Sequence, residues 1–455
     1  MVQIDEKAKG LSKARLASLF DAGTFVELSA YTKRQDGQAE LESVVCGYGA
    51  VDGRLVFAFI QDSGRTKGAF GDRHAKKIEA LYALAVKNGA PVIGVMDSAG
   101  AVVYDGAAAL AAYGRLMKTV SDASGIIPQI AVIDGVCGGS LAVAASMFDF
   151  VVTVKNTSRL FVNAPFTVGE TVSATAQGLS AHEADSEAEA FAYVKELLGV
   201  LPQNNADSVY TDSEDSLNRA VAWDSASYTA EGLLAQLADD GRMVRLYKGY
   251  TENAVMGFAS FGGVLSGVIA SNPAKQGILD IKTARAAAKL VSFCDSFGIP
   301  LLTLVDSEGL EVTAEAENAA YASELARLAM AYTSSDNAKL TVIVGKAYGT
   351  AFTLLGSKAV GADMALALPT ACISVLSPEA SVAFVWNDKV GEKSRAELES
   401  EWKEKCASAQ EAADAGEIDD IIEPSELRQR ICSALSMLAA KAEGAPVRKH
   451  AGLPL

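Results

Sequence analysis

Closely spaced glycines follow an apolar run in the stretch VIDGVCGGSLAVAASM (Val132–Met147). An apolar run, then Gly138-Gly139, then small residues is typical of a buried strand, a tight turn and a helix packed closely on a sheet. The first N–H groups of a helix have no intrahelical acceptor. Such a turn therefore suits an anion: a phosphate, a carboxylate or the oxyanion of an enolate. The structural alternative is that the glycines only let helix and strand approach.

The same pattern recurs in VIVGKAYGTAFTLLG (Val342–Gly356). Aligned without gaps, Gly345, Gly349 and Thr350 stand where the first stretch has Gly135, Gly139 and Ser140, at an offset of about 210 residues. Because other segments share this offset, the sequence predicts an internal repeat in which each half contributes one glycine-rich turn.

The segments before each glycine-rich stretch follow one order. In the first half, GYGAVDGRLVFAFIQD predicts two strands around the Asp52-Gly53 turn, His74 to Val86 has helical spacing, and PVIGVMDSAG predicts a buried strand. The second half repeats this order with GFASFGGVLSGVIAS, a helix from Thr283 to Phe297, and PLLTLVDSEG. Repeated β-β-α-β units predict an α/β fold with parallel strands covered by helices.

The join between the halves lies in LPQNNADSVYTDSEDS, a polar, turn-rich stretch that predicts a surface linker. We place the domains at residues 1–227 and 228–455. Three further helices are expected, at residues 5–20, Leu179–Val200 and Ser425–Ala442.

Composition excludes several functional classes. The 455 residues, 50% of them hydrophobic, suit two domains better than one. A net charge of −16 disfavours nucleic acid as a partner. The six cysteines form no CxxC pair and the three histidines lie far apart, so neither a disulfide framework nor a metal site is expected. Without a signal peptide or membrane-spanning run, we expect a cytoplasmic protein.

The chain resembles the carboxyltransferase (beta) subunit of biotin-dependent acyl-CoA carboxylases, such as propionyl-CoA carboxylase. It is equally similar to the carboxyltransferase subunit of acyl-CoA decarboxylases of the methylmalonyl-CoA and glutaconyl-CoA kind. The resemblance covers nearly the whole chain and rests on eight stretches in family order: GAPVIGVMDSAG, LPQNN, KQGILDI, FCDSFGIPLLTLVD, VIVGKAYGTAF, GSKAVGADMALALPTACI, AADAGEIDDIIEP and VRKHAGLPL.

The resemblance implies a fold of two tandem, duplicated crotonase-like domains (the ClpP/crotonase β-β-α superhelix). The N-terminal domain would serve the acyl-CoA and the C-terminal domain the biotin. It also implies a homo-oligomer, from a dimer to a hexamer, in which the N-terminal half of one subunit faces the C-terminal half of another.

The resemblance further implies that backbone N–H groups stabilise two oxyanions as CO2 moves between carboxybiotin and the alpha carbon of an acyl-CoA. At the first turn the donors would be Gly139 and Ser140, or Gly138 and Gly139 if the turn is one residue shorter. At the second turn they would be Thr350 and Ala351, next to Gly349. Thr353 falls at the position that selects the acyl group in the family, where an acid is usual.

Candidate contacts to coenzyme A lie in two first-half loops. They are Arg65, Lys67, Gly68, Gly100, Ala101 and Gly106. In the functional interpretation, loop N–H groups and a cation hold the adenine and phosphates. In the alternative, Arg65 and Lys67 are solvated loop charges.

The chain has neither a biotinyl-lysine motif nor a glycine-rich ATP-binding region. Biotin would therefore be attached to a separate biotin carrier protein. A biotin carboxylase or a membrane decarboxylase subunit would be a further partner. The second case couples decarboxylation to sodium export.

Two loops depart from the family pattern. Val102 replaces an arginine, and Ser307-Glu308-Gly309 replaces a Pro-Gly-Phe turn. These changes keep open a degenerate paralogue that only binds acyl-CoA or scaffolds a complex. A crotonase-type hydratase or isomerase also stays open and would need a glutamate at the turn. Glu170 and Glu308 are the candidates.

Overall fold

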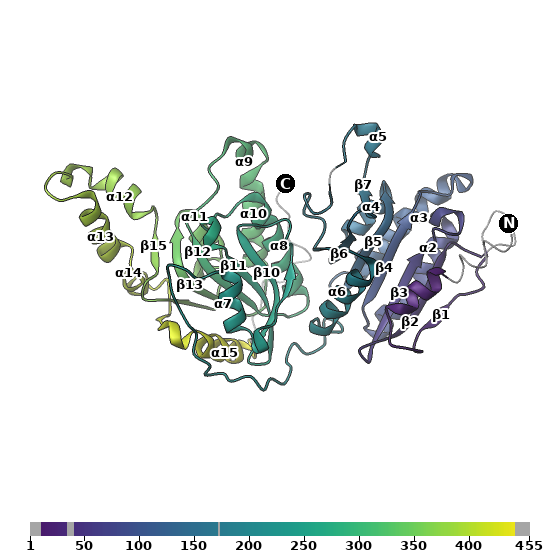
Figure 1. Cartoon of the computed structure of the whole chain (residues 1–455), viewed down its shortest axis with the longest axis horizontal. Helices are drawn as coiled ribbons and strands as arrows, with labels where there is room; N and C mark the ends of the chain where they lie inside the picture. The colour runs from purple at the N-terminus through teal and green to yellow at the C-terminus, as the bar shows by residue number, and fades with distance from the viewer. Residues whose placement is uncertain (1–10, 34–40, 172, 442–455) are drawn as a thin grey trace. The chain divides into compact units, whose positions relative to one another are not determined.

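The structure is a computed structural model that describes residues 11–33, 41–171 and 173–441. It divides into two compact units, residues 1–207 and 208–455, and each unit has its own eight-stranded sheet (Figure 1). The predicted boundary at residue 227 lies inside the second unit, because Tyr210 already pairs with Val264 there.

The first sheet has the strand order β1-β2-β3-β4-β5-β6-β8, and β7 pairs with β5. The pairs β1–β2 and β2–β3 are antiparallel, and the pairs from β3–β4 onward are parallel. Residues 11–18 are helical. The strands are β1 Val26–Leu28, β2 Val44–Val51, β3 Arg54–Gln61, β4 Val92–Ser98, β5 Gln129–Gly138, β6 Phe150–Val154, β7 Arg159–Phe161 and β8 His182–Ala184; the helices are α2 Asp72–Asn88, α3 Ala107–Ala123, α4 Ser140–Ser146, α5 Pro165–Val168 and α6 Glu187–Val200.

The second sheet repeats this topology, with the order β16-β14-β13-β12-β11-β10-β9 and with β15 on β13. Helices α12 and α13 project from this unit as a pair (Figure 1). The strands are β9 Val244–Leu246, β10 Ala254–Phe261, β11 Val264–Ser271, β12 Leu301–Ser307, β13 Lys339–Tyr348, β14 Met364–Ala367, β15 Cys372–Ser374 and β16 Asp420–Ile421; the helices are α7 Ala230–Leu237, α8 Ile281–Ser296, α9 Ala314–Asn318, α10 Tyr321–Ser334, α11 Gly349–Leu354, α12 Pro378–Val385, α13 Arg395–Cys406, α14 Ala409–Asp414 and α15 Leu427–Leu438.

The internal repeat predicted from the sequence is confirmed. The β2–β3 hairpin turns through Asp52 and Gly53, and the β10–β11 hairpin through Gly262 and Gly263, all four with positive φ. Two consecutive positive φ values match the twist of a tight hairpin. Each unit continues with a helix, a parallel strand, a further helix and a long strand that ends at its glycine-rich turn. The fold is thus the expected tandem α/β duplication.

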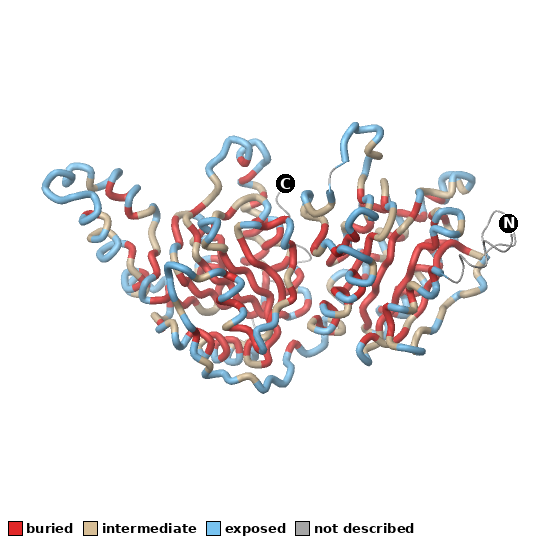
Figure 2. Tube along the Cα trace, viewed as in Figure 1, coloured by how far each residue is buried: buried red, intermediate tan, exposed pale blue. Residues whose placement is uncertain are grey.

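Each unit has its own hydrophobic core between sheet and helices (Figure 2). In the first unit Phe59, Val92 and Ile133 from the sheet pack with Ile78 of α2 and Leu116 of α3. Uninterrupted apolar stretches in the parallel strands produce this burial, because helices cover such sheets. No helix within the described ranges is long and apolar enough to cross a membrane.

Two predicted helices differ from the structure. Between Leu179 and Val200 the chain first forms the short strand β8 against β6, and α6 begins only at Glu187. Ser186 sets this start, because its side chain accepts a hydrogen bond from the N–H of Glu189. The closing helix α15 ends at Leu438. In the helix expected at residues 5–20, residues 5–10 lie outside the described part of the chain.

Candidate active site

The carboxylate of Asp97 holds the first glycine-rich strand where β4 ends. Its Oδ1 accepts a hydrogen bond from the N–H of Val136 at 3.1 Å. A Cβ atom on Gly135 would lie 2.1 Å from the same carboxylate, so the approach requires glycine. The pairing of β4 with β5 shifts register here, which lets the end of β5 bend toward its turn.

The second unit contains the same arrangement. Asp306 accepts a hydrogen bond from the N–H of Lys346 at 2.8 Å, and a Cβ on Gly345 would lie 2.4 Å from the carboxylate. The Tyr228 hydroxyl also donates to Asp306, at 2.5 Å. Each glycine-rich turn is therefore built on a strand that an aspartate from the neighbouring strand holds in place.

The first turn has Gly139 at φ +59° and ψ −129°, a conformation that side-chain-bearing residues rarely adopt. The N–H of Gly139 donates to the carbonyl oxygen of Phe161 in β7 at 2.9 Å. This N–H is used within the chain, contrary to the expectation that it donates to a bound carbonyl in either pair, with Ser140 or with Gly138. Ser140 is exposed and begins α4, where first-turn N–H groups have no intrahelical acceptor.

The second turn has Gly349 at φ +57° and opens on a cavity of about 620 Å³. Thr350 and Thr353 are exposed and line it, together with Gly349, Phe352, Ile373 and Val375. Ala351 is fully buried and does not line the cavity in this structure. The structure thus brings three of the four residues predicted around this turn into one hollow.

The predicted coenzyme A loops lie together at the ends of β3 and β4. The N–H of Ala99 donates to the carbonyl of Lys67 at 2.9 Å, and the N–H of Phe70 donates to the carbonyl of Gly100 at 2.8 Å. Gly68 packs so closely that a Cβ would lie 2.2 Å from the carbonyl oxygen of Asp97. These bonds place the loop of Lys67 and Gly68 against the strand that carries Asp97.

Arg65 and Lys67 differ in environment. The Arg65 guanidinium lies 3.1 Å from the Asp62 carboxylate and donates to the carbonyl of Glu42 at 3.2 Å, and its side chain is only 10% exposed. Arg65 therefore ties the loop to the body of the unit. Lys67 is exposed, at φ +53°, and presents a cation on the loop.

The other first-unit candidates lie on the loop between β4 and α3. Ala101 pairs with Phe70 in an isolated bridge. Gly106 precedes the first residue of α3 at φ +52° and has open space around its Cα. All six predicted coenzyme A contacts thus lie in two adjoining loops.

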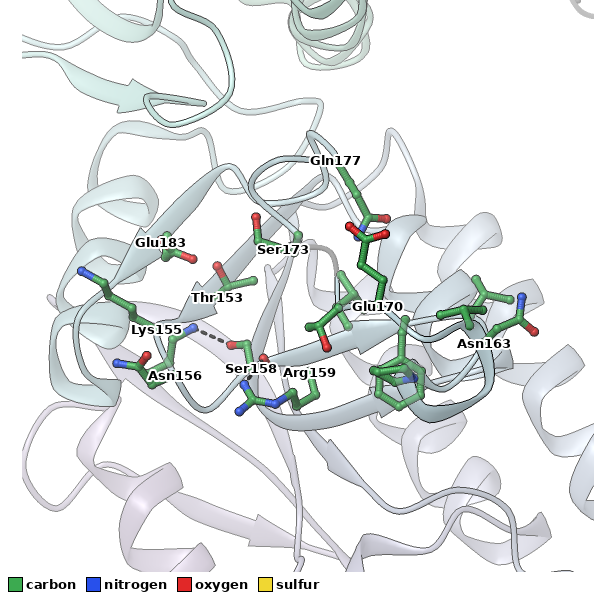
Figure 3. Close-up of a pocket in the computed structure, with 18 residues that line it drawn as sticks. Thr153, Lys155, Asn156, Ser158, Arg159, Asn163, Glu170, Ser173, Gln177 and Glu183 are labelled. Carbon is green, nitrogen blue, oxygen red and sulfur yellow. Dashed lines mark hydrogen bonds between the residues drawn. The ribbon is translucent and has the colours of Figure 1, made fainter.

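A cavity of about 660 Å³ in the first unit was not predicted from the sequence (Figure 3). It lies between β6, β7 and the segment around α5, and its lining includes Arg159, Asn163 and Glu170. In its wall, the Ser158 hydroxyl accepts the N–H of Val154 at 2.7 Å. Glu170 lines this cavity, whereas Gly139 and Ser140 do not.

The other glutamate considered for a hydratase, Glu308, is paired with a cation. Its carboxylate lies 2.5 Å from the Nζ of Lys346, just before the second turn. The hydrogen bond that Lys346 donates to Glu308 raises the pKa of Lys346. The Glu308 carboxylate is therefore engaged by the neighbouring lysine.

Comparison with known proteins defines the class. A protein-family model described as "Carboxyl transferase domain" matches residues 5–453 of this chain. The chain is 34% identical over 480 residues to methylmalonyl-CoA decarboxylase subunit alpha of Veillonella parvula, covering 99% of this chain and 94% of that protein. It is also 34% identical over 497 residues to the propionyl-CoA carboxylase beta chain of Saccharopolyspora erythraea, with coverages of 99% and 91%.

Among solved structures, transcarboxylase 12S matches with a TM-score of 0.93 and 29% identity, over 100% of this chain and 95% of that one. That structure is described as a hexamer assembly with methylmalonyl-coenzyme A and methylmalonic acid bound.

Two crotonase-like units, each with a glycine turn fixed by an aspartate, define an enzyme of the tandem acyl-CoA carboxyltransferase class. The chain belongs to the carboxyl transferase family. It is a biotin-dependent acyl-CoA carboxyltransferase, as the sequence indicated, and its reaction involves biotin and a coenzyme A thioester.

Proposed function

We propose that this chain moves a carboxyl group between carboxybiotin on a separate carrier protein and the alpha carbon of a short acyl-CoA. The observation that carries the proposal is the duplicated turn, with Gly139 at φ +59° and Gly349 at φ +57° at the ends of equivalent strands. Transfer develops charge on two oxygens, that of the thioester and that of the ureido group. Two sets of fixed donors suit this requirement.

In the first unit, the proposed donor to the thioester oxygen is the N–H of Ser140, since that of Gly139 is already bonded. Lys67 is the proposed cation for the phosphates of coenzyme A, and Gly100, Ala101 and Gly106 supply the adjoining backbone. Arg65 holds this loop in place through Asp62.

In the second unit, the proposed biotin site is the cavity beside Gly349. Its volume of about 620 Å³ lies within the usual range for small-ligand sites. Apolar Phe352, Ile373 and Val375 suit a bicyclic ring, and Thr350 supplies a backbone N–H and a hydroxyl. When bound, biotin supplies the ureido group that carries the carboxyl. The N–H of Ala351, beside that of Thr350, stays the second proposed donor to the biotin oxygen.

We further propose a homo-oligomer of two to six copies. Helix α12 and the chain before it expose large apolar side chains, among them Val375 at 82%, Phe384 at 84% and Val385 at 52%. Exposed apolar patches of this kind mark protein contacts. Biotin carrier and biotin carboxylase or membrane decarboxylase subunits are the proposed further partners, and a cytoplasmic location stays a prediction.

The test is transfer of label from [14C]methylmalonyl-CoA or [14C]malonyl-CoA to free biotin. Biotin-dependent loss of label from either thioester supports the proposal. Failure with both thioesters, by a protein that binds them, favours the degenerate paralogue. Hydration of crotonyl-CoA without biotin would instead identify a hydratase. Light scattering on Phe384→Glu tests the oligomer, and an unchanged mass would remove α12 from the contact.

A further inference from the structure

A chain of hydrogen bonds crosses the buried interior of the first unit and joins Asp97 to Ala69. The N–H of Asp97 donates to Oε1 of Gln61 at 3.1 Å, and Nε2 of Gln61 lies 3.5 Å from Nε2 of His74. On the other side of the ring, Nδ1 of His74 lies 3.3 Å from the Ser43 hydroxyl, which reaches the carbonyl of Ala69 at 3.0 Å. Gln61, His74 and Ser43 are all fully buried.

The bonds at both ends determine which ring nitrogen of His74 carries the proton. Because Oε1 of Gln61 accepts from Asp97, the amide presents its NH2 group to the ring, and Nε2 must be the acceptor. A neutral imidazole then carries its hydrogen on Nδ1 and donates to Ser43. The Ser43 hydroxyl in turn reaches the carbonyl of Ala69 at 3.0 Å and the Glu42 carboxylate at 3.2 Å. The amide cannot flip without placing its NH2 group against the N–H of Asp97.

Charged groups lie near the ring, but its two closest polar partners are Gln61 and Ser43. The Glu42 carboxylate lies 3.7 Å from Nδ1, and Lys77 from α2 also faces the region, with Arg65 and Asp62 on the adjoining loop. Burial lowers the pKa of His74, against the opposing effect of Glu42. Protonation would also set Nε2–H against the NH2 group of Gln61, two donors with no acceptor between them.

Both ends of the chain of bonds lie at the proposed acyl-CoA side. Asp97 holds the strand of the first turn through Val136, and Ala69 follows Gly68 in the coenzyme A loop. In the described part of the second unit, other residue types stand at the equivalent positions. There β11 ends at Ser271 where β3 ends at Gln61, and the third residue of α8 is Thr283 where α2 has His74.

We propose that His74, held as the neutral Nδ1–H tautomer by Gln61 and Ser43, is a positioning residue for the acyl-CoA half of the site. The inference rests on the proposed function, since it assumes that the loop of Gly68 and the first turn bind the thioester. By fixing Asp97 and Ala69 relative to one another, the ring sets the separation between the coenzyme A loop and the donor at Ser140.

The first test does not depend on activity. The chain has three histidines, so selective 15N-histidine labelling of the full chain and solid-state NMR, with His74→Gln for assignment, isolate this ring. We expect a protonated Nδ1 and a bare Nε2 at pH 7, because burial lowers the pKa of the ring. An Nε2–H tautomer, or a charged ring at pH 7, overturns the inference.

Gln61→Glu provides a second spectroscopic test. A carboxylate cannot donate to Nε2 and favours the imidazolium. The measured pKa of His74 should therefore rise by about 1 unit or more in this variant. If the neutral Nδ1–H form persists unchanged in this variant, Gln61 does not select the tautomer and the inference fails.

The kinetic test separates positioning from general damage. In label transfer to free biotin, His74→Leu should raise the KM for methylmalonyl-CoA at least tenfold and leave the KM for biotin within twofold. His74→Gln, whose amide can accept from Gln61 and donate to Ser43, should recover most of the loss. His182→Gln is the matched control, since His182 lies in β8 and stacks on Tyr193 of α6.

Outcomes of the kinetic test are distinct. Equal rises in both KM values, or no rise in either, refute the positioning role while the proposed function stands. If His74→Leu does not fold, Gln61→Glu carries the same KM comparison. Absence of transfer in the unmodified enzyme refutes the proposed function instead, and the NMR result then decides the tautomer alone.

Discussion

The N–H of Gly139 donates to the carbonyl oxygen of Phe161, and this bond ties the first turn to β7. With the Gly139 N–H bonded in this way, the N–H of Ser140 is the proposed donor at this turn. Ser140→Pro removes that N–H at the first helical position, where proline is tolerated. We expect kcat for label transfer to fall by about 10²–10³, the usual loss for one oxyanion donor.

Ser140→Ala is the control for this variant, because it deletes the hydroxyl and keeps the N–H. It should retain kcat within about threefold. Equal losses in both variants would assign the effect to the hydroxyl, and full activity in Ser140→Pro would exclude this N–H from the reaction.

Gly68→Ala should disturb the coenzyme A loop selectively. The new methyl group would lie 2.2 Å from the carbonyl of Asp97, at a residue with φ +66°. The left-handed conformation alone costs a side-chain-bearing residue about 1–2 kcal/mol. Hydrogen exchange of residues 65–69, followed by mass spectrometry, should accelerate, and the KM for the acyl-CoA should rise.

The matched control is Gly114→Ala in α3, where nothing lies within 4 Å of the new methyl group and φ is ordinary. This change should stabilise the unit by about 0.5–1 kcal/mol. Exchange in the loop that is equally slow in both variants would show that Gly68 tolerates a side chain.

Arg428 should be essential for the stability of the second unit. Its side chain is fully buried, donates to Asp239 at 2.6 Å and to the carbonyl of Ser216 at 2.9 Å, and also bonds the carbonyl of Leu237. Asp239 in turn accepts the N–H groups of Gly262 and Gly263. Arg428→Met leaves a buried carboxylate unpaired, which costs about 3–5 kcal/mol.

Tryptophan fluorescence in urea measures this loss, because all three tryptophans, at positions 223, 386 and 402, belong to the second unit. Arg430→Met on the same helix is the control. Arg430 pairs with Asp420 at a half-exposed site, so its loss should cost less than about 1 kcal/mol. Similar losses in both variants would contradict the role given to Arg428.

Acid should weaken the same network. A hydrogen bond from the Arg219 side chain lowers the pKa of Asp215 from 3.8 to about 2. A carboxyl with a lowered pKa stabilises the folded state above its unfolded pKa and loses that contribution as pH falls through the folded value. The urea midpoint should therefore fall between about pH 4 and pH 2, and less steeply in Asp215→Asn. Parallel curves would assign the acid sensitivity to other groups.

Periodicity and turn chemistry predicted the repeated elements because local residues decide them. Asp52-Gly53 and Gly262-Gly263 demand tight hairpins, and the apolar run of β5 needs cover on both faces. The strand β8 was missed because His182–Ala184 has no strand pattern of its own. It forms only because β6 offers an open edge.

At the site, residue types predicted where the turns lie but not how each N–H is used. The bond from Gly139 depends on β7, which begins twenty residues further along the chain. The role of His74 was also missed, since its partners Ser43 and Gln61 meet it only through tertiary folding. The sequence feature that could have indicated this network is the polar Gln61-Asp62 pair at the end of an apolar strand.

The clasp between an aspartate and a glycine, Asp97 with Gly135 and Asp306 with Gly345, leaves no room for any side chain at either glycine. Random drift can thus alter the loops around both turns far more readily than these two points. The aspartate–glycine pair can therefore serve as a reference point for aligning the two halves of distant duplicated chains of this architecture. It does so even where the intervening segments have changed length.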